Sequence, residues 1–227
     1  MSGKDITISA SDGQFSSYLA TAAGPAAGSV VVIQEIFGVN SHIRAVCDRL
    51  AAAGFNALAP DLFHRSEPGV QLGYAEADVN QGFALMQQMD HAKALADIDA
   101  CFADLRSHGG QVAVLGFCMG GLLAFRSAAN LNPDAAVAYY GGGIANFLGE
   151  AGNIRCPIQF HFGEKDHFIP MTDVEKIRLA TAVTAESELH VYPADHGFNC
   201  DQRGSYDASA ARLAWQRSLD FLRRHLG

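Results

Sequence analysis

The sequence predicts an α/β fold with a mainly parallel central sheet, helices on both faces of that sheet, and an antiparallel edge formed by the N-terminal strands. Short, continuously apolar runs such as residues 30–33 and 112–115 suit strands that are buried on both faces. Longer segments with helical periodicity lie between such runs, and this alternation is typical of parallel sheets covered by helices. A length of 227 residues suits one domain, so we expect residues 1–227 to form a single domain.

The first elements show two different patterns. Period-2 alternation around residues 6–8 and 15–19 predicts an antiparallel pair of strands at one edge of the sheet. The strand at residues 30–33 begins the parallel part, and apolar residues at helical spacing predict a helix over residues 42–53. Residues 55–59 form the next predicted strand.

A long excursion separates this strand from the one at residues 112–115. It begins with a loop at residues 65–73, which contains a Pro-Gly turn signal, and continues with a partly helical segment at residues 74–89. A strong helix follows, marked by the apolar residues Leu95, Ile98, Phe102 and Leu105.

The second half of the chain repeats the alternation of strands and helices. Strands are predicted at residues 112–115, 136–140, 158–162 and 188–192. Helices are predicted near residues 121–130 and 172–183, and a last helix carries Ala211, Ala214, Trp215, Ser218, Leu219 and Leu222 on one face. Ligands of open α/β sheets bind beyond the carboxyl ends of the strands, so functional residues are expected there.

The segment Gly116-Phe117-Cys118-Met119-Gly120 directly follows an apolar strand and has the pattern of a nucleophile elbow with a thiol nucleophile. Glycines on both sides of the nucleophile let the turn between strand and helix close without Cβ clashes. The first turn of the following helix would present free N–H groups and a positive dipole end to the sulfur. Cys118 is therefore the candidate nucleophile, and the alternative is a buried structural cysteine.

A carboxylate and a histidine follow Cys118 in the loops after later strands. Asp166 lies in the loop after residues 158–162, and His196 lies in the loop after residues 188–192. A histidine can shuttle the proton of a nucleophile, while a carboxylate orients the imidazole and stabilises its charged form. Without such a role, Asp166 would cap a turn and His196 would be a solvated loop residue. Residue types and chain order together predict covalent hydrolysis by a Cys-His-Asp triad.

Together with the segment Gln34-Glu35-Ile36-Phe37-Gly38, these motifs resemble the dienelactone hydrolase family of the α/β-hydrolase superfamily, over nearly the whole chain. The resemblance implies a single-domain α/β-hydrolase fold and an enzyme that cleaves ester or lactone bonds. The substrate from which the family takes its name is an anionic enol lactone, whose ring opens to give maleylacetate. The triad needs neither a cofactor nor a metal ion, and we expect none.

The resemblance also implies roles for residues near the thiol. Glu35 matches a family glutamate that holds the resting thiol neutral and takes part in its activation when substrate arrives. The backbone N–H groups of Ile36 and Met119 are the candidate oxyanion-hole donors. The alternative for Glu35 is an exposed carboxylate at a strand end.

The candidates for substrate binding are Phe37, Cys200 and Arg203. Characterised family members bind the substrate carboxylate with arginines, one of them four residues after the histidine, where this chain has Cys200. Arg203 follows three residues later. A buried anion needs a charged partner, so a broad-specificity carboxylesterase for neutral small esters is the alternative to a dienelactone hydrolase.

Composition excludes several other classes of function. The net charge is −8, from 16 basic and 24 acidic side chains, which argues against nucleic-acid binding. The N-terminus lacks the apolar region of a signal peptide, and no run approaches the length of a membrane span. The five cysteines are odd in number and irregularly spaced, which suits a reducing compartment. We expect a cytoplasmic monomer or homodimer whose partner is a small ester or lactone.

Cys47 and Cys101 lie on helical faces, and we expect both in the core. Cys156 lies at a strand entry and is expected to be structural too.

Two functions from other classes stay as alternatives. A redox-sensing thiol protein would use an activated cysteine, but it would need a resolving cysteine and neither Asp166 nor His196. A catalytically silent binding module with this fold would have no reason to keep all three triad residues.

Overall fold

The computed structural model describes residues 3–184 and 186–227, and the chain falls into two compact units. The first unit extends to Val112 and includes Leu226, while the second extends from Ala113 to His225 and includes Gly227. The prediction that residues 1–227 form a single domain therefore stays a prediction.

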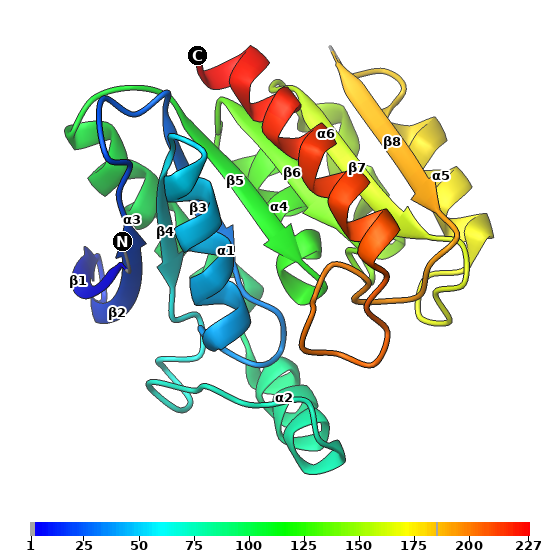
Figure 1. The fold of residues 1–227 in the computed structure, drawn as a ribbon, viewed down its shortest axis with the longest axis horizontal. Coiled ribbons are helices and arrows are strands. Elements are labelled where there is room, and N and C mark those ends of the chain that lie inside the picture. The colour runs from blue at the N-terminus through cyan, green and yellow to red at the C-terminus, as the bar shows by residue number, and fades with distance from the viewer. Residues whose placement is uncertain (1–2, 185) are drawn as a thin grey trace. The chain divides into compact units, whose positions relative to one another are not determined.

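The first unit is an α/β unit in which α1 and α3 lie on opposite faces of the strands (Figure 1). Its elements in chain order are β1 (Lys4–Ala10), β2 (Gly13–Ala20), β3 (Ser29–Ile33), α1 (Ser41–Ala52), β4 (Asn56–Pro60), α2 (Glu76–Gln88) and α3 (His91–Ser107). The predicted helix over residues 42–53 and the strong helix of the excursion are thus confirmed as α1 and α3. The segment at residues 74–89, predicted to be partly helical, contains α2.

The strands of the first unit pair in the order β1-β2-β4-β3. β1 and β2 are antiparallel, β2 and β4 are also antiparallel, and β3 runs parallel to β4. Side chains along β1 alternate in burial, whereas every residue of β3 is buried. The two sequence patterns therefore correspond to an antiparallel edge and to a strand covered on both faces.

The second unit contains the parallel strands that position the candidate triad. Its elements in chain order are β5 (Val112–Phe117), α4 (Met119–Asn130), β6 (Ala135–Tyr139), the 3₁₀ segment η1 (Ile144–Asn153), β7 (Ile158–Gly163), α5 (Met171–Thr181), β8 (Ser187–Tyr192) and α6 (Ala208–Leu226). The strands pair in the order β5-β6-β7-β8, and every pair is parallel. Figure 1 shows α6 on one face of these strands and α4 and α5 on the other.

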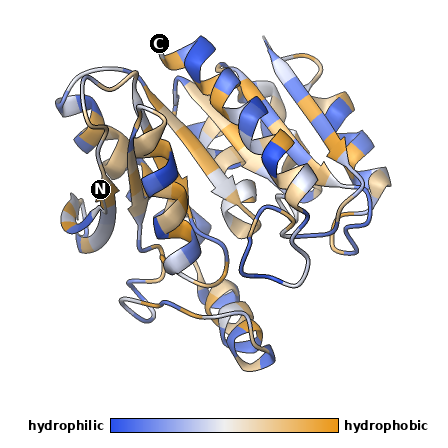
Figure 2. Cartoon of the chain, in the orientation of Figure 1, coloured by the Kyte–Doolittle hydropathy of each residue, from blue (hydrophilic) through white to orange (hydrophobic). Residues whose placement is uncertain are grey.

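The predicted α/β class, with mainly parallel strands and an antiparallel N-terminal edge, is confirmed. Burial explains the sequence patterns of the second unit. All residues of β5, β6 and β7 are buried, whereas residues 187–191 of β8 are only partly buried. β5 and β6 accordingly have continuous apolar runs, and β7 contains the buried polar residues Gln159 and His161. The last helix, α6, shows alternating hydrophilic and hydrophobic stripes (Figure 2), as expected for a helix with one face in the core.

The sequence did not predict η1, which follows a run of glycines after β6 and is kinked at Phe147 (φ −120, ψ 17). Such a short, irregular segment has no helical periodicity to detect. Within the described residues, no helix combines the length and the apolar character that a membrane span requires.

Candidate active site

Cys118 stands at the sharp turn between β5 and α4. Its backbone has φ 57 and ψ −116, a positive-φ conformation that residues with a side chain rarely adopt. The N–H of Cys118 donates to the carbonyl oxygen of Tyr139 at 3.0 Å, which fixes the turn against β6. The side chain is partly exposed beyond the carboxyl end of β5. The structure thus has the strained strand-turn-helix geometry that the sequence predicts for an elbow.

The glycines of the elbow are explained by close backbone contacts. A Cβ atom on Gly116 would lie 1.9 Å from the carbonyl oxygen of Gly120, and one on Gly121 would lie 2.5 Å from that of Tyr139. Neither contact is sterically possible. Because the turn is this tight, α4 begins at Met119, and the N–H of Met119 belongs to the first turn, at the positive end of the helix dipole.

His196 and Asp166 form a buried pair at the carboxyl ends of β8 and β7. The imidazole Nδ1 lies 2.8 Å from Oδ2 of Asp166. The other carboxylate oxygen, Oδ1, accepts the backbone N–H groups of Phe168 at 2.8 Å and Ile169 at 3.2 Å. Three hydrogen bonds therefore hold the Asp166 carboxylate in place, and it can orient the imidazole as the acid of a triad does.

The electrostatics of His196 bring Cys118 into the same group. Burial alone would lower the pKa of His196, but the negative charge of the Cys118 sulfur and the hydrogen bond to Asp166 outweigh burial and raise this pKa to about 10. The His196 side chain is also hydrogen-bonded to Cys118. The sulfur, the imidazole and the carboxylate thus form one continuous chain of interactions.

Two aromatic rings contact the His196 imidazole, and the sequence analysis assigned neither a role. Tyr140 is fully buried, and its ring centroid lies 5.1 Å from that of His196. Phe168 packs edge-on at 5.2 Å but is 66% exposed. Tyr140 also has a positive φ of 35, and its N–H donates to the carbonyl oxygen of His161 at 2.7 Å. The sequence signal was position alone: Tyr140 directly follows β6, and Phe168 follows Asp166 by two residues.

A buried polar network supports the strands that carry Asp166 and His196. His161 is fully buried, with Nδ1 2.8 Å from the Tyr192 hydroxyl and Nε2 2.9 Å from Ser218 Oγ. Burial, with repulsion from His190 and Arg217, lowers the pKa of His161 well below its ordinary value. His161 is therefore a neutral structural residue that ties β7 to β8 and to α6.

Glu35, Ile36 and Phe37 follow β3 in the first unit. Glu35 is 1% exposed, so it is not the exposed strand-end carboxylate of the alternative interpretation. The Tyr74 hydroxyl donates to Glu35 Oε2 at 3.5 Å, and the Tyr74 ring packs edge-on against Phe37 with centroids 4.7 Å apart. Ile36 is also buried. Because these residues and Cys118 belong to different units, the roles predicted for Glu35, Ile36 and Phe37 stay predictions.

Cys200 and Arg203 lie in the loop after His196. Cys200 is fully buried, and its N–H donates to the carbonyl oxygen of Gly197 at 3.0 Å. The guanidinium group of Arg203 lies over Gly197, where a Cβ atom would be 2.5 Å from Nη1 and where φ is +77. Gly197 thus leaves room for a positive charge next to the backbone of His196. Contact of Cys200 or Arg203 with substrate stays a prediction.

Arg65 is an arginine on the excursion between β4 and β5. Its guanidinium is paired with two carboxylates: Nη2 lies 2.9 Å from Oδ1 of Asp97 and 2.8 Å from Oδ1 of Asp12, and Nη1 also contacts Asp97. The hydrogen bond to Asp97 raises the pKa of Arg65 despite partial burial. This arginine is engaged within the protein and is a poor candidate for a substrate carboxylate.

All five cysteines are free, and four of them are buried. Burial raises the pKa of the thiols of Cys47, Cys101 and Cys156, the last to about 11. The expectation that these three are core or structural residues is confirmed. Cys118 alone among the cysteines is partly exposed, and the other four are not suited to act as nucleophiles.

Comparisons with known proteins agree with this geometry. The model of the dienelactone hydrolase family matches residues 15–226. A protein of Azospirillum brasilense is 42% identical over 230 residues, which cover 98% of this chain and 99% of that protein. A carboxymethylenebutenolidase of Pseudomonas putida is 35% identical over 96% of this chain and 94% of its own length. A solved structure from Klebsiella pneumoniae has a TM-score of 0.84 at 33% identity and covers 96% of each chain.

Proposed function

The chain belongs to the dienelactone hydrolase family and has its α/β-hydrolase fold, and from this premise we propose that it hydrolyses esters or lactones through a Cys118-His196-Asp166 triad. Membership identifies a hydrolase of ester and lactone bonds. The observation that supports the triad is the chain of interactions from the Cys118 sulfur through the His196 imidazole to the Asp166 carboxylate.

In the first half of the reaction, the sulfur of Cys118 attacks the carbonyl carbon. A C–S bond forms while the carbonyl π electrons move to the oxygen, and the N–H groups of Met119 and Ile36 stabilise the resulting oxyanion. The intermediate then collapses, the C–O bond to the leaving group breaks, and the His196 imidazolium gives its proton to the leaving oxygen. For a lactone, that oxygen stays attached to the acyl group, so the ring opens without release of a fragment.

In the second half, water hydrolyses the thioester. Once the sulfur is acylated it carries no negative charge, and one of the causes that raise the pKa of His196 disappears. The imidazole, already neutral after giving its proton to the leaving oxygen, therefore stays neutral and takes a proton from the attacking water. The C–S bond then breaks, the sulfur keeps the electron pair, and the acid product is released. Asp166 keeps its hydrogen bond to Nδ1 throughout and stabilises each charged form of the ring.

We assign Glu35 the task of controlling the resting thiol. A buried carboxylate near the sulfur disfavours the thiolate by repulsion, which protects the thiol from oxidation until substrate binds. The family resemblance and the burial of Glu35 support this assignment.

The substrate class is proposed to be small esters or lactones, with two candidates. Relatives named carboxymethylenebutenolidase favour an anionic lactone. The burial of Cys200, where the family has an arginine, favours neutral esters. Arg203 is the candidate to replace the missing arginine, because its guanidinium lies over Gly197, the residue that follows His196.

We further propose a cytoplasmic location, because five free cysteines suit a reducing compartment. We also propose that the protein is a monomer or a homodimer.

Covalent trapping tests the triad directly. The protein is mixed with activated esters and lactones, quenched with acid within milliseconds to seconds, digested and analysed by mass spectrometry. We expect an acyl adduct on Cys118, and the buried cysteines serve as internal controls because their peptides should stay unmodified. Turnover without any adduct, or an adduct on another residue, would contradict covalent catalysis by Cys118.

A further inference from the structure

Phe168 is an exposed aromatic residue in contact with the candidate catalytic histidine. Its ring centroid lies 5.2 Å from that of His196 in an edge-on arrangement, although 66% of the residue is exposed. On another side, the same imidazole contacts the fully buried Tyr140. Packing of the core thus accounts for Tyr140, whereas Phe168 leaves most of its apolar surface in water.

The loop holds Phe168 firmly in this position. Its backbone N–H donates to Oδ1 of Asp166 at 2.8 Å, and the next residue, Ile169, donates to the same oxygen at 3.2 Å. Ile169 is buried, so the chain is anchored in the core directly after Phe168. The Asp166 carboxylate therefore fixes both His196 and the backbone of Phe168.

The position of the ring relates it to one side of the substrate. Because Nδ1 of His196 is bound to Asp166, the proton that leaves during acylation is on Nε2. The leaving oxygen must come within hydrogen-bond distance of Nε2, so substituents on that oxygen lie next to the imidazole and to the ring that packs on it. The acyl substituent is attached to the carbonyl carbon, one bond farther from Nε2 than the leaving oxygen.

We propose that Phe168 is a specificity-determining residue which binds the leaving-group side of the substrate and favours aromatic and other apolar leaving groups. This inference rests on the proposed function. An apolar group that lies on the Phe168 ring removes surface of both partners from water, and an aromatic group also gains edge or offset stacking contacts. A leaving group as small as ethanol covers little of the ring and gains little.

Two isomeric esters test the proposal. Benzyl acetate carries its phenyl ring on the leaving side, and methyl phenylacetate contains the same atoms with the ring on the acyl side. We expect Phe168→Ala to lower kcat/KM about fivefold or more for benzyl acetate and less than twofold for methyl phenylacetate. Phe168→Leu, which keeps apolar surface but no aromatic ring, should fall between the wild type and Phe168→Ala. Comparing each ester with itself across variants cancels differences in intrinsic reactivity.

Leu179→Ala is the matched control, because Leu179 on α5 is also 66% exposed. It should change neither kcat/KM value. The pH dependence of kcat/KM should stay the same in Phe168→Ala, because a specificity residue does not alter the titration of His196. Equal losses of kcat/KM for both isomers in Phe168→Ala, with a shifted pH profile, would mean that Phe168 positions the imidazole, and they would overturn the proposal. Unchanged kcat/KM values for both isomers would overturn it as well.

Failure of the proposed function appears in a different measurement. If Cys118→Ala kept its turnover, the triad mechanism would be wrong whatever the isomer ratio. An isomer ratio that Phe168→Ala leaves unchanged, in an enzyme whose activity does depend on Cys118, overturns the role of Phe168 alone.

Discussion

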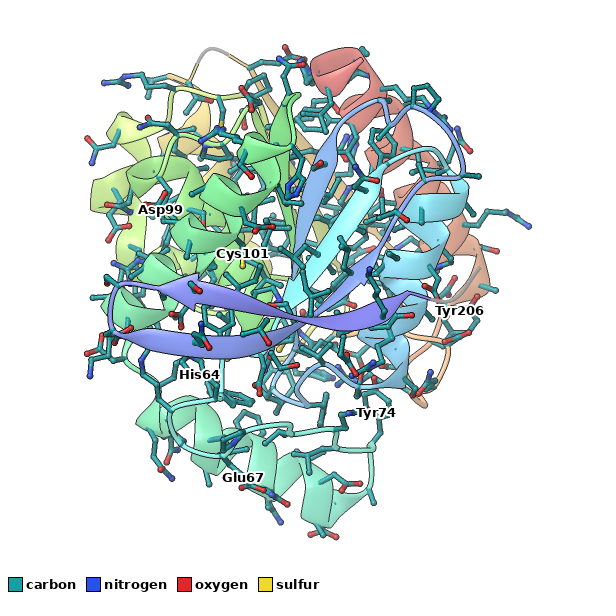
Figure 3. The ribbon with its side chains drawn as sticks, turned by 90° about the vertical axis from the view of Figure 1, so that its left-hand side faces the viewer. His64, Glu67, Tyr74, Asp99, Cys101 and Tyr206 are labelled. Carbon is teal, nitrogen blue, oxygen red and sulfur yellow. The ribbon has the colours of Figure 1, made fainter. Side chains whose placement is uncertain are left out.

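Each unit of this protein contains a histidine-aspartate pair with a buried carboxylate, and the two pairs differ in their third partner. In the second unit, His196 Nδ1 lies 2.8 Å from Asp166, and the His196 side chain is hydrogen-bonded to Cys118. In the first unit, His64 Nε2 lies 3.1 Å from Asp97, whose side chain is fully buried. The His64 ring stacks on Phe15 beneath the β1–β2 hairpin, where Figure 3 labels it.

The carboxylates of the two pairs have different partners: one is paired with a cation and the other accepts hydrogen bonds from neutral backbone N–H groups. The guanidinium of Arg65, which is also paired with Asp12, neutralises the carboxylate of Asp97. The charge of Asp97 is therefore balanced by a side chain of the protein itself. Asp166 is held by neutral backbone N–H groups, so its negative charge remains available to stabilise the imidazolium of His196. The partners of each member therefore distinguish the pair proposed for catalysis from the pair that is neutralised within the structure.

Removing the sulfur should have the largest effect on activity. We expect Cys118→Ala to lower kcat by about 10⁴-fold or more while the protein stays folded, because members of a triad act as a unit. Cys118→Ser should keep measurable ester hydrolysis, since the histidine-aspartate pair can activate a hydroxyl. Steady-state kinetics and circular dichroism measure both; a Cys118→Ala variant with a tenth of wild-type activity would refute the covalent scheme.

Asparagine substitutions then separate the two pairs. Asp166→Asn should lower kcat by about 10³–10⁴-fold, because the amide no longer stabilises the charged imidazole. Asp97→Asn should leave kcat within about threefold but lower the free energy of unfolding by about 3 kcal/mol, because it leaves Arg65 without its buried partner. Kinetics and urea unfolding measure both variants, and a large loss of kcat in Asp97→Asn would make the first pair part of the catalytic machinery.

The two arginines extend the comparison to substrate choice. If Arg203 binds an anionic lactone, Arg203→Gln should reduce kcat/KM for that lactone about 10- to 100-fold more than for a neutral ester, the value of a charged hydrogen bond. Arg65→Gln should change stability but leave this ratio the same. Both measurements require one fixed ionic strength. An unchanged ratio in Arg203→Gln would leave neutral esters as the substrate class.

Glu35→Gln should have a smaller effect, on the resting thiol. With no repelling carboxylate, the thiolate fraction of Cys118 increases, and alkylation by iodoacetamide at neutral pH should become several-fold faster. Glu67→Gln, an exposed carboxylate on the excursion of the first unit (Figure 3), is the control. Equal alkylation rates in wild type and Glu35→Gln would place Glu35 away from the sulfur.

The last expected effect is a change in titration. Because a negative charge on the Cys118 sulfur is one cause that raises the pKa of His196 to about 10, an imidazole beside an ionised sulfur should stay protonated up to about that pH and lose its proton above it. In Cys118→Ala, only the interaction with Asp166 still raises the pKa of His196, while burial still lowers it. The pKa of His196 should therefore be lower in this variant than in the wild type. NMR of labelled histidine follows both rings, and the His64 signal should be unaffected. A His196 pKa that stays near 10 would show that the sulfur does not contribute.

Local sequence patterns predicted the elements and the order of the candidate site residues. Cys118, Asp166 and His196 each follow a strand with a distinct apolar pattern, and parallel strands bring their carboxyl ends to one edge. Continuous apolar runs and period-2 alternation likewise distinguished β3 from β1, because burial on one face or two acts directly on residue choice.

The remaining features depend on contacts between segments far apart in the sequence. The exposure of Phe168, the positive φ of Tyr140 and the placement of Arg203 over Gly197 arise from loop packing, which has no periodic signal. The pairing of Arg65 with Asp12 and Asp97 joins residues from a hairpin turn, the excursion and α3. Only the folded chain reveals which charges are neutralised within it.

The elbow at Cys118 also bears on how such a protein can change over generations. A cysteine held at φ 57 costs stability that glycine at the same position would recover, about 1 kcal/mol, because glycine has no Cβ to strain. Selection for stability alone would thus favour replacement of Cys118 by glycine, and a requirement for the thiol opposes this replacement. A descendant released from catalysis should lose this cysteine early and become more stable as it does so.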